Sequence, residues 1–122
     1  MDEPTAGDLC RADAGQSRPA TNVCYCQVII ELMQFRLMDG TDADEFLAAD
    51  RRLQEEFAYH QPGLLRRTTA QSNDGEWVVI DHWQTAADAD ACSERWAHDA
   101  IAQTFMRHID LSWIRVQRYT TL

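Results

Sequence analysis

The feature that most constrains this chain is the order in which strand-like and helical segments follow one another. Stretches rich in β-branched and aromatic residues alternate with stretches whose apolar residues recur every three or four positions, as in amphipathic helices. The strand-like stretches are residues 23–37, 64–71, 76–83 and 111–122, and the helical ones are 42–60 and 85–110. This β-α-β-β-α-β order is ferredoxin-like, and right-handed crossovers place both helices on one face of a four-stranded antiparallel sheet. We therefore predict one α+β domain over residues 23–122.

The first helical stretch has capping signals and one apolar face. Asp42 with Glu45, or Thr41 with Asp44, has the spacing of a capping box. Asp50 is among the polar residues predicted to face water. The residues that recur at helical intervals, and therefore predict the buried face, are Phe46, Ala49, Leu53, Phe57 and His60.

Local signals also mark the ends of the later elements. Pro62 disfavours helical geometry in the residue before it, and the Pro-Gly pair suits a type II turn. The tetrapeptide SNDG indicates a hairpin between the second and third strands. Thr85 with Asp88 has capping-box spacing, and the second helical stretch is expected to bend near His98 and Asp99.

The first and third strands are apolar on both of their alternating faces. In the first strand one face holds Val28, Ile30 and Leu32, and the other holds Ile29, Met33 and Phe35. Two helices on one side of a sheet cover only one face, so the other face needs a cover of its own. A second sheet from an identical chain is the simplest cover. We therefore predict a homodimer whose two sheets face each other around cavities.

Residues 1–22 are rich in Asp, Ala, Gly, Ser and Pro without periodicity, which predicts a flexible arm outside the domain. This stretch has no apolar segment typical of a secretory signal, which favours a cytoplasmic location, and no apolar run approaches the ~20 residues that span a bilayer. The net charge of −9 repels phosphate backbones and anionic lipid. Neither nucleic acid nor a membrane is therefore expected as a partner.

The four cysteines are Cys10, Cys24, Cys26 and Cys92. Cys24 and Cys26 are two apart in a strand-like stretch, so they point the same way and are too far apart to bridge each other easily. Their spacing is not that of a zinc site, and no second pair follows. Reduced structural thiols, and no bound metal, are the expectation.

Four segments together resemble the antibiotic biosynthesis monooxygenase type of dimeric α/β-barrel protein. They are "FRLMDGTDADEFLAA", "PGLLRRT", "DGEWVVIDHWQTAADADA" and "RWAHDAIAQTF", and the resemblance covers residues 28–121. That family includes cofactor-independent oxygenases of polycyclic aromatic or quinol-like molecules, haem-degrading enzymes and autoinducer-modifying enzymes. The resemblance implies a monooxygenase without cofactor that acts on a hydrophobic aromatic molecule. In such chemistry a base removes a phenolic proton, the substrate anion reacts with O₂, and an apolar pocket shields the intermediate.

The haem-degrading branch of the family implies an alternative in which haem binds. Its members resemble this chain in a tryptophan of the second helix, which Trp96 matches. Their haem-ligating histidine follows the tryptophan by about nine residues. That position corresponds here to Thr104 or Phe105, and neither side chain can bind iron as an imidazole does. His98 and His108 flank that position and are the alternative ligands. An asparagine on the first strand of that branch corresponds here to Met33 or Gln34.

Strand alternation divides residues 76–83 into two faces, with Trp77, Val79, Asp81 and Trp83 on one and Val78, Ile80 and His82 on the other. Small aliphatic side chains suit a face packed against helices, and large aromatics with an acid suit a cavity between two sheets. We therefore assign the odd-numbered face to the cavity between the sheets, although a shift of one residue in register would invert the assignment. The same logic assigns to that cavity Glu31, Met33 and Phe35.

Asp81 and His82 are the candidate catalytic bases. A carboxylate in an apolar cavity has a raised pKa, and an imidazole titrates near neutral pH. Arg66 and Arg67 are consecutive, so only one of them faces inward, and Arg67 is the candidate for holding a substrate anion. An ion pair between Asp81 and Arg67 and a structural role for His82 are the simpler alternatives.

The candidate substrate-binding residues are Glu31, Met33, Arg67, Trp77, Trp83 and Trp96. The simpler alternative for Glu31 is an ion pair, for instance with Arg115, and for the tryptophans it is packing. A cavity plugged by its own tryptophans would favour a third interpretation, a binding module or dimer without catalysis. The chain has no nucleophile elbow, phosphate-binding loop, H-E-x-x-H helix or dinucleotide fingerprint, so hydrolase, nucleotide-driven and zinc peptidase chemistry are unsupported.

Overall fold

The computed structural model describes residues 27–122, and the compact unit considered below is Ile29–Tyr119. The predicted arm, residues 1–22, and the predicted start of the first strand at residue 23 lie outside the described residues. Within residues 27–122 no helix is long and apolar enough to cross a membrane.

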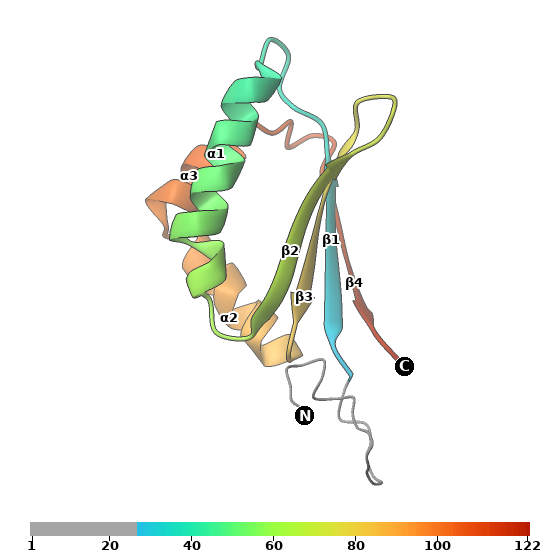
Figure 1. Ribbon diagram of the computed structural model, residues 1–122. Helices are drawn as coiled ribbons and strands as arrows, with labels where there is room; N and C mark the ends of the chain where they lie inside the picture. The colour runs from blue at the N-terminus through green and yellow to red at the C-terminus, as the bar shows by residue number, and fades with distance from the viewer. Residues whose placement is uncertain (1–26) are drawn as a thin grey trace, which may run out of the picture. The chain divides into compact units, whose positions relative to one another are not determined.

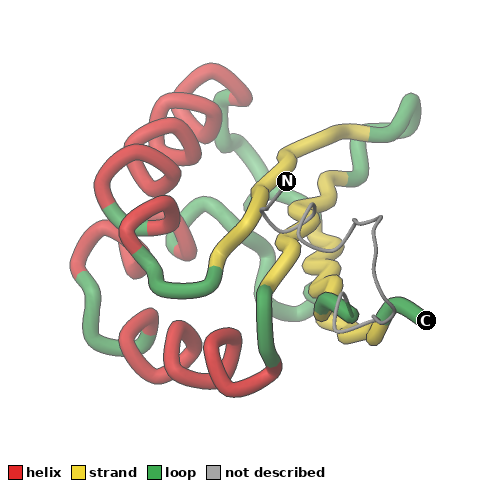
Figure 2. Tube along the Cα trace, turned by 60° about the horizontal axis from the view of Figure 1, so that its bottom comes forward, coloured by secondary structure: helices red, strands yellow, loops and turns green. Residues whose placement is uncertain are grey.

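The order of elements is the predicted one, and the ferredoxin-like α+β fold is confirmed (Figure 1). The strands form one sheet in the order β2-β3-β1-β4, in which β3 pairs antiparallel with both β1 and β2. All three α-helices lie on one side of this sheet, as Figure 2 shows. The elements are β1 (Ile29–Phe35), α1 (Ala43–Glu56), the 3₁₀ turn η2 (Ala58–His60), β2 (Leu64–Gln71), β3 (Trp77–Trp83), α2 (Ala86–Trp96), α3 (Ala100–Met106) and β4 (Arg115–Thr120).

Side-chain caps begin the helices where the spacing predicts them. Asp42 accepts a hydrogen bond from the backbone N–H of Glu45, which selects the first of the two capping alternatives for α1. Thr85 caps α2 by accepting from the N–H of Asp88 at 3.0 Å. The predicted bend in the second helical stretch is a complete break. Asp99 starts α3 by accepting from two backbone N–H groups at 2.9 Å.

Three element ends differ from the prediction. The apolar face of α1 does not extend to His60, which is exposed in η2. β1 ends at Phe35, two residues before the predicted end. The last strand begins only at Arg115, because the Asp110 carboxylate accepts from both the N–H and the hydroxyl of Ser112 and holds a turn there.

The core lies between the sheet and the helices and is largely aromatic. Phe35 of β1, Phe46 of α1 and Phe105 of α3 are completely buried, with ring centroids 5.4–6.3 Å apart. Trp77 packs against Phe46 at 4.9 Å, and Trp96 stands edge-on to Phe105. Truncating one such ring costs about 3–5 kcal/mol, so this cluster holds the helices to the sheet.

The prediction that the odd-numbered face of β3 lines a cavity between two sheets is wrong. Trp77, Val79 and Trp83 are at most 6% exposed and belong to the core beneath the helices. The physical reason is size: the wide gap between a helix layer and a sheet needs large side chains to fill it. Val78 and Ile80 lie on the opposite, open face of the sheet.

A second correction concerns Asp50, which was predicted to face water and is only 7% exposed. It lies four residues after Phe46 and three residues before Leu53, and therefore on the same buried side of α1 as these two residues. A carboxylate thus occupies a core position of α1.

Candidate functional site

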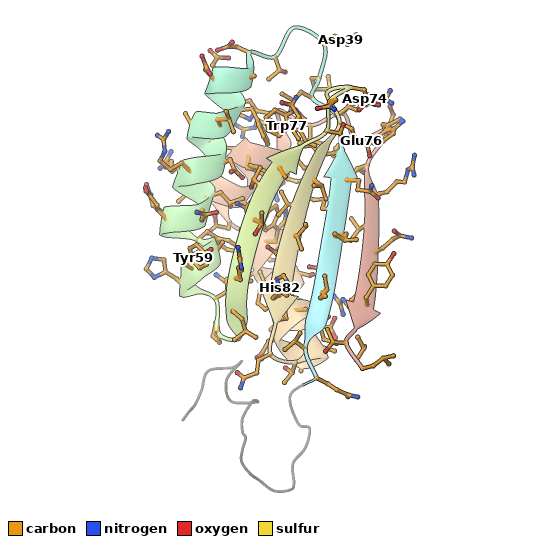
Figure 3. The ribbon with its side chains drawn as sticks, turned by 45° about the vertical axis from the view of Figure 1, so that its right-hand side comes forward. Asp39, Tyr59, Asp74, Glu76, Trp77 and His82 are labelled. Atoms are coloured by element: carbon orange, nitrogen blue, oxygen red, sulfur yellow. The ribbon has the colours of Figure 1, made fainter. Side chains whose placement is uncertain are left out.

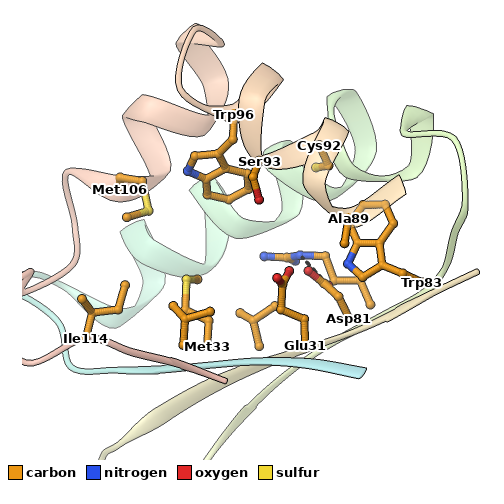
Figure 4. Close-up of a pocket in the computed structure, with 13 residues that line it drawn as sticks. Glu31, Met33, Asp81, Trp83, Ala89, Cys92, Ser93, Trp96, Met106 and Ile114 are labelled. Carbon is orange, nitrogen blue, oxygen red and sulfur yellow. Dashed lines mark ion pairs between the residues drawn. The ribbon is translucent and has the colours of Figure 1, made fainter. Parts of the chain in front are cut away.

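A pocket of about 240 Å³ lies between the sheet and helices α2 and α3 (Figure 4). It is somewhat smaller than the usual small-molecule site of about 300 Å³ or more, and it is mostly apolar, with a few polar groups converging on it. Its walls are Glu31, Met33, Arg67, Val79, Asp81, Trp83, Ala89, Cys92, Ser93, Trp96, Met106, Ile114 and Val116.

Six of the eight site residues predicted from the sequence line this one pocket. They are Glu31, Met33, Arg67, Asp81, Trp83 and Trp96. Trp83 and Trp96 form walls of the pocket and do not fill it, so the cavity is not plugged by its own tryptophans. The residues were grouped as expected, but their pocket is in the helix–sheet layer of one chain.

The other two predicted residues lie elsewhere. His82 points to the open face of the sheet, away from the helix-facing side where Asp81 lies. Partial burial, and to a smaller extent the positive charge of Arg66, lower the pKa of His82. Trp77 is at the other end of β3 (Figure 3), where it borders a shallow polar groove with Arg36 and Asp74. Neither side chain is among the walls of the Asp81 pocket.

A β-bulge in β2 decides which of the two consecutive arginines enters the pocket. The register shifts between Leu64 and Arg66, so that Leu64 is opposite Trp83 while Arg67 is opposite Asp81. Leu64 and Arg67 therefore share the helix-facing side although they are three residues apart. Arg66 is exposed on the other face, and the prediction that only one arginine points inward is confirmed.

The guanidinium of Arg67 is almost completely buried and is held mainly by α1. Its Nη2 lies 2.8 Å from Oδ1 of Asp50. Its Nη1 donates to Oε1 of Gln54 and to the hydroxyl of Thr69, both at 3.3 Å. The Thr69 hydroxyl in turn donates to Asp50 at 3.1 Å. In these contacts the two terminal nitrogens of the guanidinium bind Asp50 and Gln54 of α1, while Nε is the nitrogen nearest to Asp81.

Asp81 is half-buried, and its Oδ1 is buried with little compensation. Its Oδ1 lies 3.9 Å from Nε of Arg67, which is too long for a hydrogen bond. Burial raises the pKa of Asp81 to about 7, because the Arg67 charge that lowers it is opposed by the carboxylates of Glu31 and Asp50. Asp81 therefore changes charge near neutral pH, as a general base must.

Three buried polar atoms with no hydrogen-bond partner among the described residues belong to this pocket. They are Nη2 of Arg67, Oδ1 of Asp81 and Nε1 of Trp83. Nη2 of Arg67 has no hydrogen-bond partner although it lies 2.8 Å from Asp50, because that contact is an ion pair without hydrogen-bond alignment. Unsatisfied buried groups are rare and costly, and the donor Nε1 of Trp83 and the acceptor Oδ1 of Asp81 in one cavity favour a polar ligand.

The pocket has a polar end and an apolar end (Figure 4). Asp81 and Glu31 are at one end, where Arg67 lies beside Asp81, and Met33 and Met106 are at the other. A ligand with one polar edge and an apolar remainder matches this division.

Glu31 takes part in an ion-pair bridge beside the pocket. Arg118 of β4 donates to Oε2 of Glu31 at 3.0 Å and to Oδ1 of Asp90, on α2, at 2.8 Å. The bridge joins the edge strand to a helix near Val116, a pocket wall that is 57% exposed. The predicted pairing of Glu31 with an arginine is thus present with Arg118. Arg115 instead stacks on Trp113, 4.7 Å from the ring centroid.

The residues of the pocket do not fit a haem. No histidine is among its walls, and burial raises the pKa of Cys92 to about 11, so that its thiol stays protonated. His98 is exposed, and Nδ1 of His108 is 3.1 Å from the carbonyl oxygen of Thr104. The two alternative haem ligands therefore lie outside the pocket.

Sequence reasoning missed the residues that hold the site together, above all Asp50 and Arg118. Asp50 had a readable signal, since it occupies the same helical face as Phe46 and Leu53. Arg118 had none, because its two partners are 87 and 28 residues away along the chain.

No family model and no curated protein matches this sequence. Solved structures do. A variant of SnoaB, a cofactor-independent oxygenase from Streptomyces nogalater, superposes with a TM-score of 0.64 at 17% identity, covering 77% of this chain and 92% of SnoaB. A proposed antibiotic biosynthesis monooxygenase from Nitrosomonas europaea gives 0.61 at 20% identity, covering 77% and 98%. A dimeric ferredoxin-like protein from an uncultured marine organism gives 0.56 at 11%, covering 79% and 89%. The resemblance expected from the sequence is confirmed, and at these identities it establishes the fold.

Proposed function

We propose that this protein is an oxygenase without cofactor that acts on a small aromatic molecule carrying an ionisable hydroxyl group, such as a quinol. The observation that carries the proposal is Asp81, a buried carboxylate with a pKa of about 7 at the polar end of an otherwise apolar pocket. The structural likeness to SnoaB, itself a cofactor-independent oxygenase, supports the same conclusion.

In this proposal Asp81 removes the hydroxyl proton of the bound substrate. The negative charge then moves from Asp81 to the substrate oxygen, and the buried Arg67 stabilises the charge in both places. The electron-rich anion supplies electrons to O₂. For a quinol the products are a hydroxyquinone and water, which balances all atoms and the four electrons that O₂ accepts. The apolar walls keep bulk water from the intermediate.

The charges around the pocket favour a neutral substrate over a permanent anion. Three carboxylates, those of Glu31, Asp50 and Asp81, are close to the single guanidinium of Arg67. Arg118 is already bound to Glu31 and Asp90. A bound carboxylate or phosphate would add negative charge that no free cation of the pocket walls offsets. A neutral phenol adds none, because proton transfer only relocates the charge.

The test is oxygen uptake with 1,4-dihydroxynaphthalene, corrected for its spontaneous oxidation. We expect kcat/KM to rise with pH through about 7, as Asp81 of the free protein loses its proton. Asp81→Asn should lower kcat/KM about 10²–10⁴-fold. His82→Gln is the matched control on the opposite face of the same strand and should leave it unchanged. Uptake that survives Asp81→Asn, or that no quinol elicits above background, would reject the proposal.

We also propose that a second copy of the chain covers the open face of the sheet. The half-buried apolar residues of that face are Ile30, Leu32, Val78 and Ile80. The core cluster of the described residues contains none of them. The dimeric description of a structurally similar protein supports this assembly. Such an arrangement leaves the Asp81 pocket on the outer, helical side of each sheet.

A further inference from the structure

We propose that Asp50 is a positioning residue that decides whether Asp81 is charged, by competing with it for the guanidinium of Arg67. As a statement about catalysis the inference rests on the proposed function, and as a statement about Asp81 itself it does not. Asp50 touches neither the pocket nor a substrate within it, so its effect passes through Arg67.

The three residues form a buried row across three elements. Asp50 comes from α1, Arg67 from β2 and Asp81 from β3. The side chains of Asp50 and Arg67 are 11% and 2% exposed, and that of Asp81 is 22% exposed. One buried cation thus lies between the buried Asp50 and the half-buried Asp81, and its charge offsets only one of the two carboxylates.

The distances show which carboxylate Arg67 favours. Asp50 is 2.8 Å from the guanidinium and Asp81 is 3.9 Å from it. Gln54, also on α1, accepts from Nη1 and draws the guanidinium toward that helix, while the hydroxyl of Thr69 on β2 donates to Asp50 and holds its carboxylate in place. Asp81 therefore keeps most of the penalty of its own burial, which is why its pKa is far above the ordinary value.

The other groups that face Asp81 leave this account unchanged. Glu31 on β1 adds a like charge that also raises the pKa of Asp81, but Arg118 of β4 offsets that charge. Cys92 on α2 is protonated at neutral pH, and α3 contributes to the pocket only Met106, which does not titrate. Arg67 is the one cation among the walls of the pocket, so the contacts that hold its guanidinium set how much positive charge Asp81 meets.

The experiment is a carbon-13 NMR titration of the Asp81 carboxyl in the unliganded full chain, assigned by the signal lost in Asp81→Asn. Asp50→Asn keeps the shape of the side chain and removes its charge, so Arg67 should turn to Asp81. We expect the midpoint to fall from about 7 by about one unit or more, the effect of an opposite charge at close range. Asp50→Glu retains the charge and should retain the wild-type midpoint.

Two further variants give the test a control and an opposite sign. Glu56→Gln removes a carboxylate from the same helix that is 52% exposed, and it should leave the midpoint unmoved. Gln54→Glu adds a carboxylate against Nη1 of Arg67 and should raise the midpoint. A midpoint that stays in Asp50→Asn, or moves as far in Glu56→Gln, overturns the inference. Should Asp50→Asn not fold, a midpoint unmoved or lowered by Gln54→Glu overturns it equally.

The titration needs no substrate, so its outcome is separate from that of the proposed function. If the midpoint follows Asp50 and no quinol is oxidised, the proposed function fails while the inference stands. If quinol oxidation depends on Asp81 but the midpoints of both the titration and kcat/KM ignore Asp50, the inference alone fails.

Discussion

Among single residues, Asp81 is the one whose burial destabilises its charged form and, in the proposed function, makes it a base near neutral pH. A carboxylate that ionises near pH 7 has lost much of its hydration, and the 3.9 Å separation from Arg67 restores little of it. Proteins place strained or poorly paired groups of this kind at functional sites, where a ligand completes them. The unpaired Nε1 of Trp83 beside it belongs to the same pattern.

The burial of Asp81 predicts a pH-dependent stability. Its pKa is raised from 3.8 to about 7 in the folded protein, so the folded state binds the proton more tightly than the unfolded state does. The resulting stabilisation is full below about pH 4 and is lost as the pH rises through about 7. We expect Asp81→Asn to have little effect at pH 4 and to stabilise the protein by roughly 2–4 kcal/mol at pH 8, nearer the lower value because part of the side chain meets solvent.

Urea denaturation of both proteins between pH 4 and pH 8 measures this difference. Glu56→Gln, which removes an exposed carboxylate, should follow the wild-type curve. A difference between Asp81→Asn and wild type that is constant with pH would contradict the raised pKa.

Among the elements, the joint between η2, β2 and α2 depends on a glycine. Gly63 has a φ of 85°, as the Pro-Gly turn predicts. A Cβ at this position would collide with the side chain of Asp88, which is part of the cap that begins α2. The turn thus packs directly against the first turn of the helix whose later residues wall the pocket.

We expect Gly63→Ala to destabilise the protein by more than 2 kcal/mol. The backbone conformation alone costs about 1–2 kcal/mol for any residue with a Cβ, and the collision adds to it. Gly40→Ala is the matched control, since Gly40 has nearly the same φ but nothing within 4 Å of the added carbon. Thermal unfolding should show the larger loss for Gly63→Ala. If both variants lost the same free energy of unfolding, the side chain of Asp88 would have to move aside for the added Cβ at little cost, which would contradict the prediction.

At the scale of the whole molecule, the two faces of the sheet differ in what packs against them. The helix-covered face provides the aromatic core and the pocket, while the open face presents half-buried apolar side chains that the core formed by residues 27–122 does not include. An apolar sheet face left to water favours association. The pocket and the proposed dimer contact are therefore on opposite sides of one sheet.

This separation predicts that dimer formation is sensitive to the open face and insensitive to the helical surface. Ile80→Asp, in the central strand β3, should give a monomer in light scattering coupled to size exclusion, because it buries a charge in the contact. Leu47→Asp places the same charge on the exposed outer side of α1 and should remain a dimer. A wild-type monomer, or two variants that behave alike, would contradict the proposed assembly.

The sequence by itself determined the element order, the cap at Thr85, a capping box at either Asp42 or Thr41, and an interruption of the second helical stretch near His98 and Asp99. These follow from interactions between residues two to four positions apart, which a linear reading contains. Six of the eight candidate residues named from the sequence line one pocket, since alternation along a strand is a local property.

Only the tertiary structure decided which face of the sheet the helices cover. Strands that are apolar on both faces leave that choice to the fit between layers. Tertiary packing also selected Arg67 over Arg66 through a bulge, and it buried Asp50 beside the guanidinium. Packing of α1, β2 and β3 raises the pKa of Asp81 to about 7 mainly by burying its carboxylate, while Arg67 lowers that pKa and Glu31 and Asp50 raise it. These contacts depend on how distant segments pack together; the helical spacing of Asp50 from Phe46 and Leu53 indicates that Asp50 is buried but not which residue it pairs with.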